Sequence, residues 1–114
     1  MLTIYHNPRC SKSRQTLSLL QDQGLEPEIV LYLETIPSPE TIKLLLQKLG
    51  IGARQLLRRG EQAYKDHNLA DTSLSEQQLI AAMTKHPKLI ERPIVVNGER
   101  AAIGRPPEAV LEII

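Results

Sequence analysis

Residues 2–14, LTIYHNPRCSKSR, join a predicted strand to a predicted helix through a short loop. Leu2–Tyr5 alternates apolar and polar positions and ends in β-forming Tyr, as strands do. The loop 6–9 contains a proline, and a helix is expected from Cys10 or Ser11 to Gln23. The only cysteine of the chain therefore lies where a strand-loop segment enters a helix.

The surroundings of Cys10 favour a reactive thiolate. A helix N-terminus stabilises an anion, so it lowers the pKa of a thiol placed there. Nearby residues add positive charge or hydroxyl donors: His6, Arg9, Ser11, Lys12, Ser13 and Arg14. The alternative is a small buried hydrophobic residue, which is the usual role of a free cysteine. The pattern C-x-x-S also lacks a second thiol, so a resolving thiol would have to come from another molecule.

The next segments predict one strand and several helices. Ile29–Leu33 is a continuous apolar run, typical of a buried central strand. Ser38-Pro39-Glu40 predicts a helix start, and that helix is expected to end at Gly50. Short helical pieces are expected over 51–70. A capping box at Ser75–Gln78 begins another helix, which should stop before Pro87.

The C-terminal segment predicts a hairpin and a last helix. Ile94–Val96, then Asn97-Gly98, then Arg100–Ile103 is a hairpin pattern, and the helix begins near Pro106. The order β-α-β, helices, β-β-α predicts an α/β protein. It matches a thioredoxin-like fold with an inserted helical subdomain over about 38–88, in one domain of residues 1–114.

Composition excludes several function classes. The 114 residues carry 14 basic and 13 acidic side chains, three Tyr and neither Phe nor Trp, which argues against a nucleic-acid partner. No apolar run predicts a membrane span, and no leader pattern is seen, so a cytoplasmic location is expected. The spacing of Cys and His predicts no metal site, and no nucleotide-binding motif occurs.

Five segments together resemble the arsenate reductase (ArsC) family of the glutaredoxin-dependent type: IYHNPRCSKSR, EPEIVLYLETIP, ARQLLRR, HPKLIERPIVV and IGRPPEAVLEII. The resemblance covers nearly the whole chain and implies a thioredoxin-like fold. Two departures suggest a short branch of that family. Arg9 replaces a small residue before the cysteine, and the C-terminal tail of longer members is missing.

The resemblance implies a role for each matching residue. Cys10 resembles the nucleophile, and His6 the residue that helps to hold its thiolate. Arg58, Arg92 and Arg105 resemble the three arginines that bind the oxyanion. Ser13 and Pro93 are expected to support the site, with Pro93 at a position where thioredoxin-like folds carry a cis proline. The implied oxidoreductase activity is reduction of arsenate with glutathione as co-substrate, glutaredoxin as partner and no bound cofactor.

Two alternatives remain from the sequence. One is a glutathione-linked thiol oxidoreductase that acts on another substrate. The other is a non-enzymatic transcriptional adaptor similar to the Spx-type proteins, which share this fold. An oxyanion enzyme needs its three arginines together, whereas an adaptor needs no such set. The two-cysteine switch that Spx-type proteins often carry is absent here.

Overall fold

The computed structural model describes residues 2–114 and contains two compact units. The first unit combines the residues up to Thr35 with Arg92–Ile114, and the second is Ile36–Glu91. The first unit holds Cys10 and the whole β-sheet.

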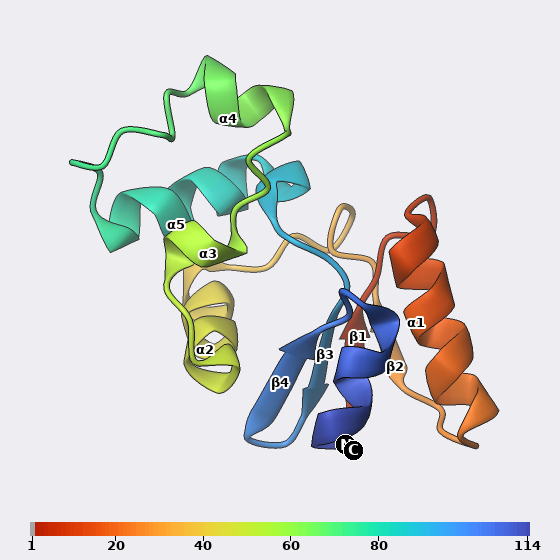
Figure 1. The fold of residues 1–114 in the computed structure, drawn as a ribbon. Helices are drawn as coiled ribbons and strands as arrows, with labels where there is room; N and C mark the ends of the chain where they lie inside the picture. Colours follow the sequence, from red (N-terminus) through yellow and green to blue (C-terminus); the bar gives the residue numbers. More distant parts are fainter. Residues whose placement is uncertain (1) are drawn as a thin grey trace. The chain divides into compact units, whose positions relative to one another are not determined.

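The first unit is built on a four-stranded sheet in the order β2-β1-β3-β4 (Figure 1). Its strands are β1 (Leu2–Tyr5), β2 (Glu28–Val30), β3 (Ile94–Asn97) and β4 (Arg100–Ile103). β1 pairs parallel with β2 and antiparallel with β3, and β3 pairs antiparallel with β4. With helix α1 (Ser11–Asp22) between β1 and β2, this is a βαβ unit joined to a ββα unit. The predicted thioredoxin-like fold is confirmed.

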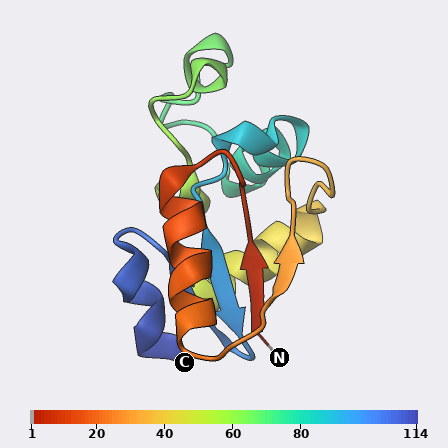
Figure 2. The ribbon, with the colours of Figure 1, turned by 90° about the vertical axis from the view of Figure 1, so that its right-hand side faces the viewer.

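Helix α1 and the 3₁₀ helix η2 (Pro107–Ile113) contribute to one hydrophobic core with the sheet (Figure 2). Ile4 of β1 lies opposite Val95 of β3 in the register, and both are fully buried. Leu20 of α1 and Val110 of η2 pack in the same cluster. Burying each such side chain contributes about 1.5–3 kcal/mol, so this core holds α1 and η2 against the sheet.

The second unit is helical. It contains α2 (Pro39–Leu49), α3 (Ala53–Leu56), α4 (Gln62–Asp66), α5 (Glu76–Lys85) and the 3₁₀ turn η1 (Pro87–Leu89). Ser38 caps α2 by accepting the Thr41 N–H, and Gly50 ends it in a left-handed conformation. Ser75 and Gln78 form the predicted capping box of α5. The helix ends expected from these signals are confirmed.

Three predicted elements differ from the structure. The segment expected as a buried central strand is β2, which is three residues long, lies at the sheet edge and leaves Ile29 46% exposed. In the hairpin, Asn97 pairs with Arg100, so the two-residue turn is Gly98-Glu99, with Gly98 at φ +63°. The last helix is entirely 3₁₀. Apolar composition alone did not distinguish an edge strand from a central one.

Gly104 lies where no side chain can be accommodated. A Cβ atom built on it would lie 2.5 Å from Thr16 Oγ1 and 2.8 Å from Pro93 Cγ. Its backbone N–H donates to the Pro93 carbonyl at 2.9 Å. Gly104 thereby holds the segment after β4 against both α1 and the start of β3.

Replacing Gly104 with Ala should destabilise the fold by about 1–3 kcal/mol, because the added methyl group forces the packed Thr16 and Pro93 to move. Urea unfolding followed by circular dichroism measures this. Gly60→Ala is the matched control, since no atom lies within 4 Å of a Cβ built there. Equal free energies of unfolding for the two variants would contradict the packing argument.

Candidate active site

Cys10 occupies the N-cap position of α1. Its backbone is extended, with φ −92° and ψ 123°, and its carbonyl accepts the Arg14 N–H at 3.0 Å. The Cys10 N–H donates to the Asn7 carbonyl at 3.0 Å, which closes the loop before the helix. The side chain is 8% exposed. No acidic residue lies in the first turn of α1, so nothing there opposes an anion.

The environment lowers the pKa of the Cys10 thiol. Burial is the largest single effect and raises the pKa, because it disfavours the charged thiolate. The backbone N–H groups of Ser13 and Lys12, the charge of Arg92 and the Arg105 guanidinium act in the opposite direction and together outweigh burial. A larger fraction of Cys10 is therefore a thiolate near neutral pH than for an ordinary cysteine.

Arg105 lies beside this sulfur, and the charge of Arg92 acts on the same thiolate. Arg105 Nη1 is 4.0 Å from Cys10 Sγ and donates to the Arg92 carbonyl oxygen at 3.1 Å. Both arginines directly precede prolines in cis peptide bonds, Arg92–Pro93 and Arg105–Pro106. The cis bond at Pro93 was implied by the family resemblance, whereas the second one was not expected. Guanidinium groups at this position suit an incoming oxyanion.

His6 contacts Ser13 rather than Cys10. His6 Nδ1 lies 2.6 Å from Ser13 Oγ, and the Asn7 N–H donates to the same oxygen at 3.0 Å. His6 and Ser13 are both buried. Burial and the nearby charge of Arg14 lower the pKa of His6, so its imidazole is neutral at pH 7. A neutral ring can accept the Ser13 O–H at Nδ1, and this bond fixes the loop that leads to Cys10.

Arg58, the third predicted arginine, belongs to the second unit. Its Nη1 donates to the Lys88 carbonyl at 3.2 Å and pairs with Glu61 Oε2 at 3.2 Å. Its role at the oxyanion site stays a prediction. Neighbouring Arg54 donates to the carbonyls of Leu69 and Asp71, which makes it a structural residue of that unit.

Sequence reasoning missed three residues that shape the site. Asn7 accepts the Cys10 N–H at its carbonyl and the Arg9 N–H at Oδ1, and it donates its own N–H to Ser13 Oγ. Gly104 and Thr16 set the place from which Arg105 reaches the sulfur. The dipeptide Asn7-Pro8 is a known turn signal, so the role of Asn7 could have been predicted from the sequence. The Gly104–Thr16 contact spans distant parts of the chain and has no local signal.

Two features are absent from residues 2–114. Their His, Cys, Asp and Glu side chains form no group of three or more that could hold a metal ion. None of their helices combines the length and apolar character needed to cross a membrane.

Comparison with known proteins gives consistent matches. Residues 5–113 match the model of the ArsC family. An Escherichia coli K12 protein, the uncharacterized protein YfgD, is 62% identical over 97% of this chain and 94% of its own length. A Haemophilus influenzae arsenate reductase is 51% identical over 97% of both chains. The solved structure of an arsenate reductase from Vibrio cholerae superposes with TM-score 0.97 at 56% identity, covering 99% of this chain and 97% of the other.

The alkylation rate of Cys10 should rise with pH to a midpoint below about 8.5, the value of a free cysteine. Arg92→Gln should move the midpoint upward, because the positive charge that favours the thiolate is lost. Arg100→Gln is the control, since Arg100 lies on β4 and donates to the Glu112 carbonyl. A midpoint that is the same in all three proteins would refute the assigned role of Arg92.

Stability should fall on acidification through the titration of His6. Its folded pKa is lowered, so the unfolded chain takes up this proton first as pH drops below about 6.5. The free energy that this pKa difference contributes to folding is therefore present in full above pH 6.5. It is lost as the pH falls from 6.5 to the pKa of His6 in the folded protein. Proton NMR of the His6 ring gives the midpoint of its titration. Urea unfolding at several pH values gives the slope of the free energy of unfolding against pH. His6→Gln should reduce that slope, and an unchanged slope would contradict the assignment.

Proposed function

Because the chain belongs to the ArsC family, we propose that it reduces arsenate to arsenite, with Cys10 as the nucleophile. The observation that carries the proposal is the contact of Arg105 with the Cys10 sulfur, together with the charge of Arg92 that acts on the same thiolate. The names of the Haemophilus influenzae and Vibrio cholerae relatives support the choice of arsenate.

The first step is a displacement at arsenic. The Cys10 thiolate attacks As(V), an S–As bond forms, and one arsenate oxygen leaves as water after protonation. Two anions must approach each other, so repulsion opposes the step. Arg92 and Arg105 offset this repulsion with charge-assisted donors to the arsenate oxygens, and in the proposal Arg58 adds a third guanidinium.

The electrons come from two external thiols. Glutathione attacks the arsenic of the Cys10 adduct and displaces a second oxygen as water. A glutaredoxin thiolate then attacks the glutathione sulfur, which leaves arsenic as As(III) and forms a glutathione–glutaredoxin mixed disulfide. Hydrolysis of the remaining S–As bond releases arsenite and restores Cys10. The scheme needs no bound cofactor, and it needs the reducing conditions of the cytoplasm.

His6 acts through Ser13 in this proposal. The buried His6–Ser13 bond at 2.6 Å holds the loop on which Cys10 sits, and the Ser13 N–H faces the thiolate. His6 is therefore a positioning residue for the nucleophile. Pro93 positions Arg105 in a similar way, because its carbonyl accepts the N–H of Gly104, the residue before Arg105.

The test is an arsenate-dependent assay with glutathione, glutaredoxin, glutathione reductase and NADPH. Cys10→Ser should abolish NADPH consumption. Arg92→Gln and Arg105→Gln should each lower kcat/KM by about 10²-fold, the usual effect of removing one donor to a developing charge. Arg59→Gln is the matched control, because Arg59 is an exposed neighbour of Arg58. Absence of arsenate-dependent NADPH use by the wild type would refute the proposal.

A thermal-shift titration separates oxyanion binding from turnover. Arsenate, phosphate and sulfate should each raise the unfolding temperature, because binding to the folded state stabilises it by mass action. Cys10→Ser should keep this shift while losing turnover, whereas Arg105→Gln should weaken it. A shift that persists in full without Arg105 would place the anion elsewhere.

A further inference from the structure

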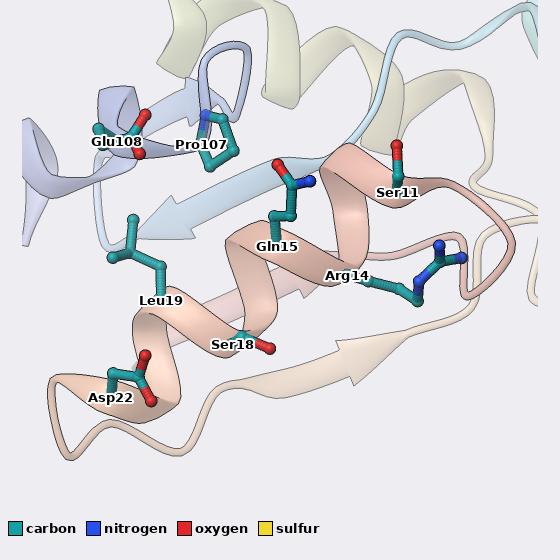
Figure 3. Close-up of a pocket in the computed structure, with 8 residues that line it drawn as sticks. All are labelled: Ser11, Arg14, Gln15, Ser18, Leu19, Asp22, Pro107 and Glu108. Carbon is teal, nitrogen blue, oxygen red and sulfur yellow. The ribbon is translucent and has the colours of Figure 1, made fainter.

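A groove on the first unit begins next to Cys10. It has a volume of about 610 Å³ and lies between α1 and the start of η2 (Figure 3). Ser11, which follows Cys10, lines one end. Pro107, two residues after Arg105, lines the opposite wall. Cys10 and Arg105 do not line the groove themselves, but a residue that follows each of them closely in the chain does, and the volume of the groove is typical of small-molecule sites.

The α1 wall presents a stripe of side chains at helical spacing. Ser11, Gln15 and Leu19 follow at i, i+4 and i+8, and such residues share one face of a helix. Figure 3 shows Gln15 pointing towards Pro107 and Leu19 pointing towards Glu108. Half-buried Leu19 and buried Pro107 give this wall an apolar part, while Ser11 and Gln15 supply polar groups.

The charges of the groove are separated along it. Arg14 extends towards the loop that precedes α1 and uses one N–H on the Pro8 carbonyl at 2.9 Å. A guanidinium has five N–H donors, so others can face a ligand. Glu108, an exposed carboxylate, lies across from Leu19. A ligand that suits this groove carries a carboxylate near Cys10 and a cation farther along.

We propose that this groove binds the peptide of a zwitterionic thiol, glutathione, and delivers its sulfur to Cys10. A glutathione carboxylate lies at Arg14, and the γ-glutamyl ammonium lies at Glu108. The inference rests on the proposed function, because it identifies where the co-substrate of that reaction binds. The α1 wall from Ser11 to Asp22 is about 17 Å long, at 1.5 Å per residue, whereas an extended tripeptide spans about 11 Å.

Placement in the groove gives glutathione an advantage over other thiols. A thiol bound in the groove is already next to the arsenic on Cys10. Its attack is therefore faster, because an oriented, bound reactant acts at a high effective concentration. A neutral thiol of equal reactivity lacks the two charged contacts, so it reaches the arsenic only by random collision. The groove thereby sets specificity for the thiol, while the arginines set specificity for the oxyanion.

The groove can be tested without arsenate, by the reaction of Cys10 with disulfides. The thiolate attacks one sulfur of oxidised glutathione, the S–S bond breaks, and one glutathione thiolate leaves. Mass spectrometry follows the mixed disulfide on Cys10. The comparison probe is dithiodipropionate, a dianionic disulfide that has no ammonium group. The ratio of the two rate constants cancels any change in the reactivity of Cys10 itself.

Glu108→Gln should lower the rate constant for oxidised glutathione by about two- to five-fold, the effect of losing one partly exposed ion pair. It should not slow dithiodipropionate. Glu112→Gln is the control on the same helix, because Glu112 is exposed and lies outside the groove. Either substitution also removes one negative charge from the protein. This change alone should raise both rate constants, because both probes are anionic. A Glu108→Gln variant that reacts faster with both, as Glu112→Gln would, overturns the proposal.

A second measurement uses the non-reactive analogue S-methylglutathione with the Cys10→Ser variant. Amide NMR shifts at Ser18, Leu19 and Glu108 are expected, and shifts confined to other residues would overturn the groove. The two proposals fail separately. Arsenate reduction with an unchanged disulfide rate ratio in Glu108→Gln would refute the groove alone. A selective effect of Glu108→Gln without arsenate turnover would support the groove and refute the proposed reaction.

Discussion

The close approach of Gly104 to Thr16 and Pro93 is the contact on which the site depends. It places the segment after β4 against the helix that begins at Cys10, and Arg105 is the next residue. A side chain at position 104 would separate the two parts of the site, because both neighbours are buried and packed. The Gly104–Pro93 hydrogen bond fixes the same segment relative to β3. The distance from Arg105 to the sulfur thus follows from a residue that has no functional group.

Burial and charge act against each other at Cys10. Burial raises its pKa, whereas the amides of α1 and two arginines lower it. A buried neutral His6 adds no positive charge to this balance, so it contributes through shape and hydrogen bonding. Ser13 connects this neutral ring to the loop before Cys10, and the expected role of His6 at the thiolate stays a prediction. Arginine suits the electrostatic part because it stays charged even when partly buried.

Local signals gave the fold in large part, and non-local contacts account for what was missed. Ser38, Gly50 and Ser75 act through bonds within a few residues, so the helix ends that they set were predictable. The edge position of β2 depends on which strands pair, and a short apolar run does not encode that. Cys10 and its cationic neighbours were identifiable from spacing alone. Arg105 came from resemblance, and Gly104 was not found, because its neighbours are far away in sequence.

The pairing of β1 with β3 joins Leu2 to Asn97, with the whole second unit between them in the chain. Closing so long a loop costs conformational entropy before any strand contact compensates it, and contacts of this kind form slowly. Arg92 and Arg105, which favour the thiolate, flank β3 and β4, so they are synthesised after Cys10. A chain whose first and last segments have not met therefore lacks the part of the Cys10 pKa shift that the two arginines contribute. The cysteine reaches its full reactivity when the first and last segments have met, which makes the rate of thiol alkylation a measure of completed folding.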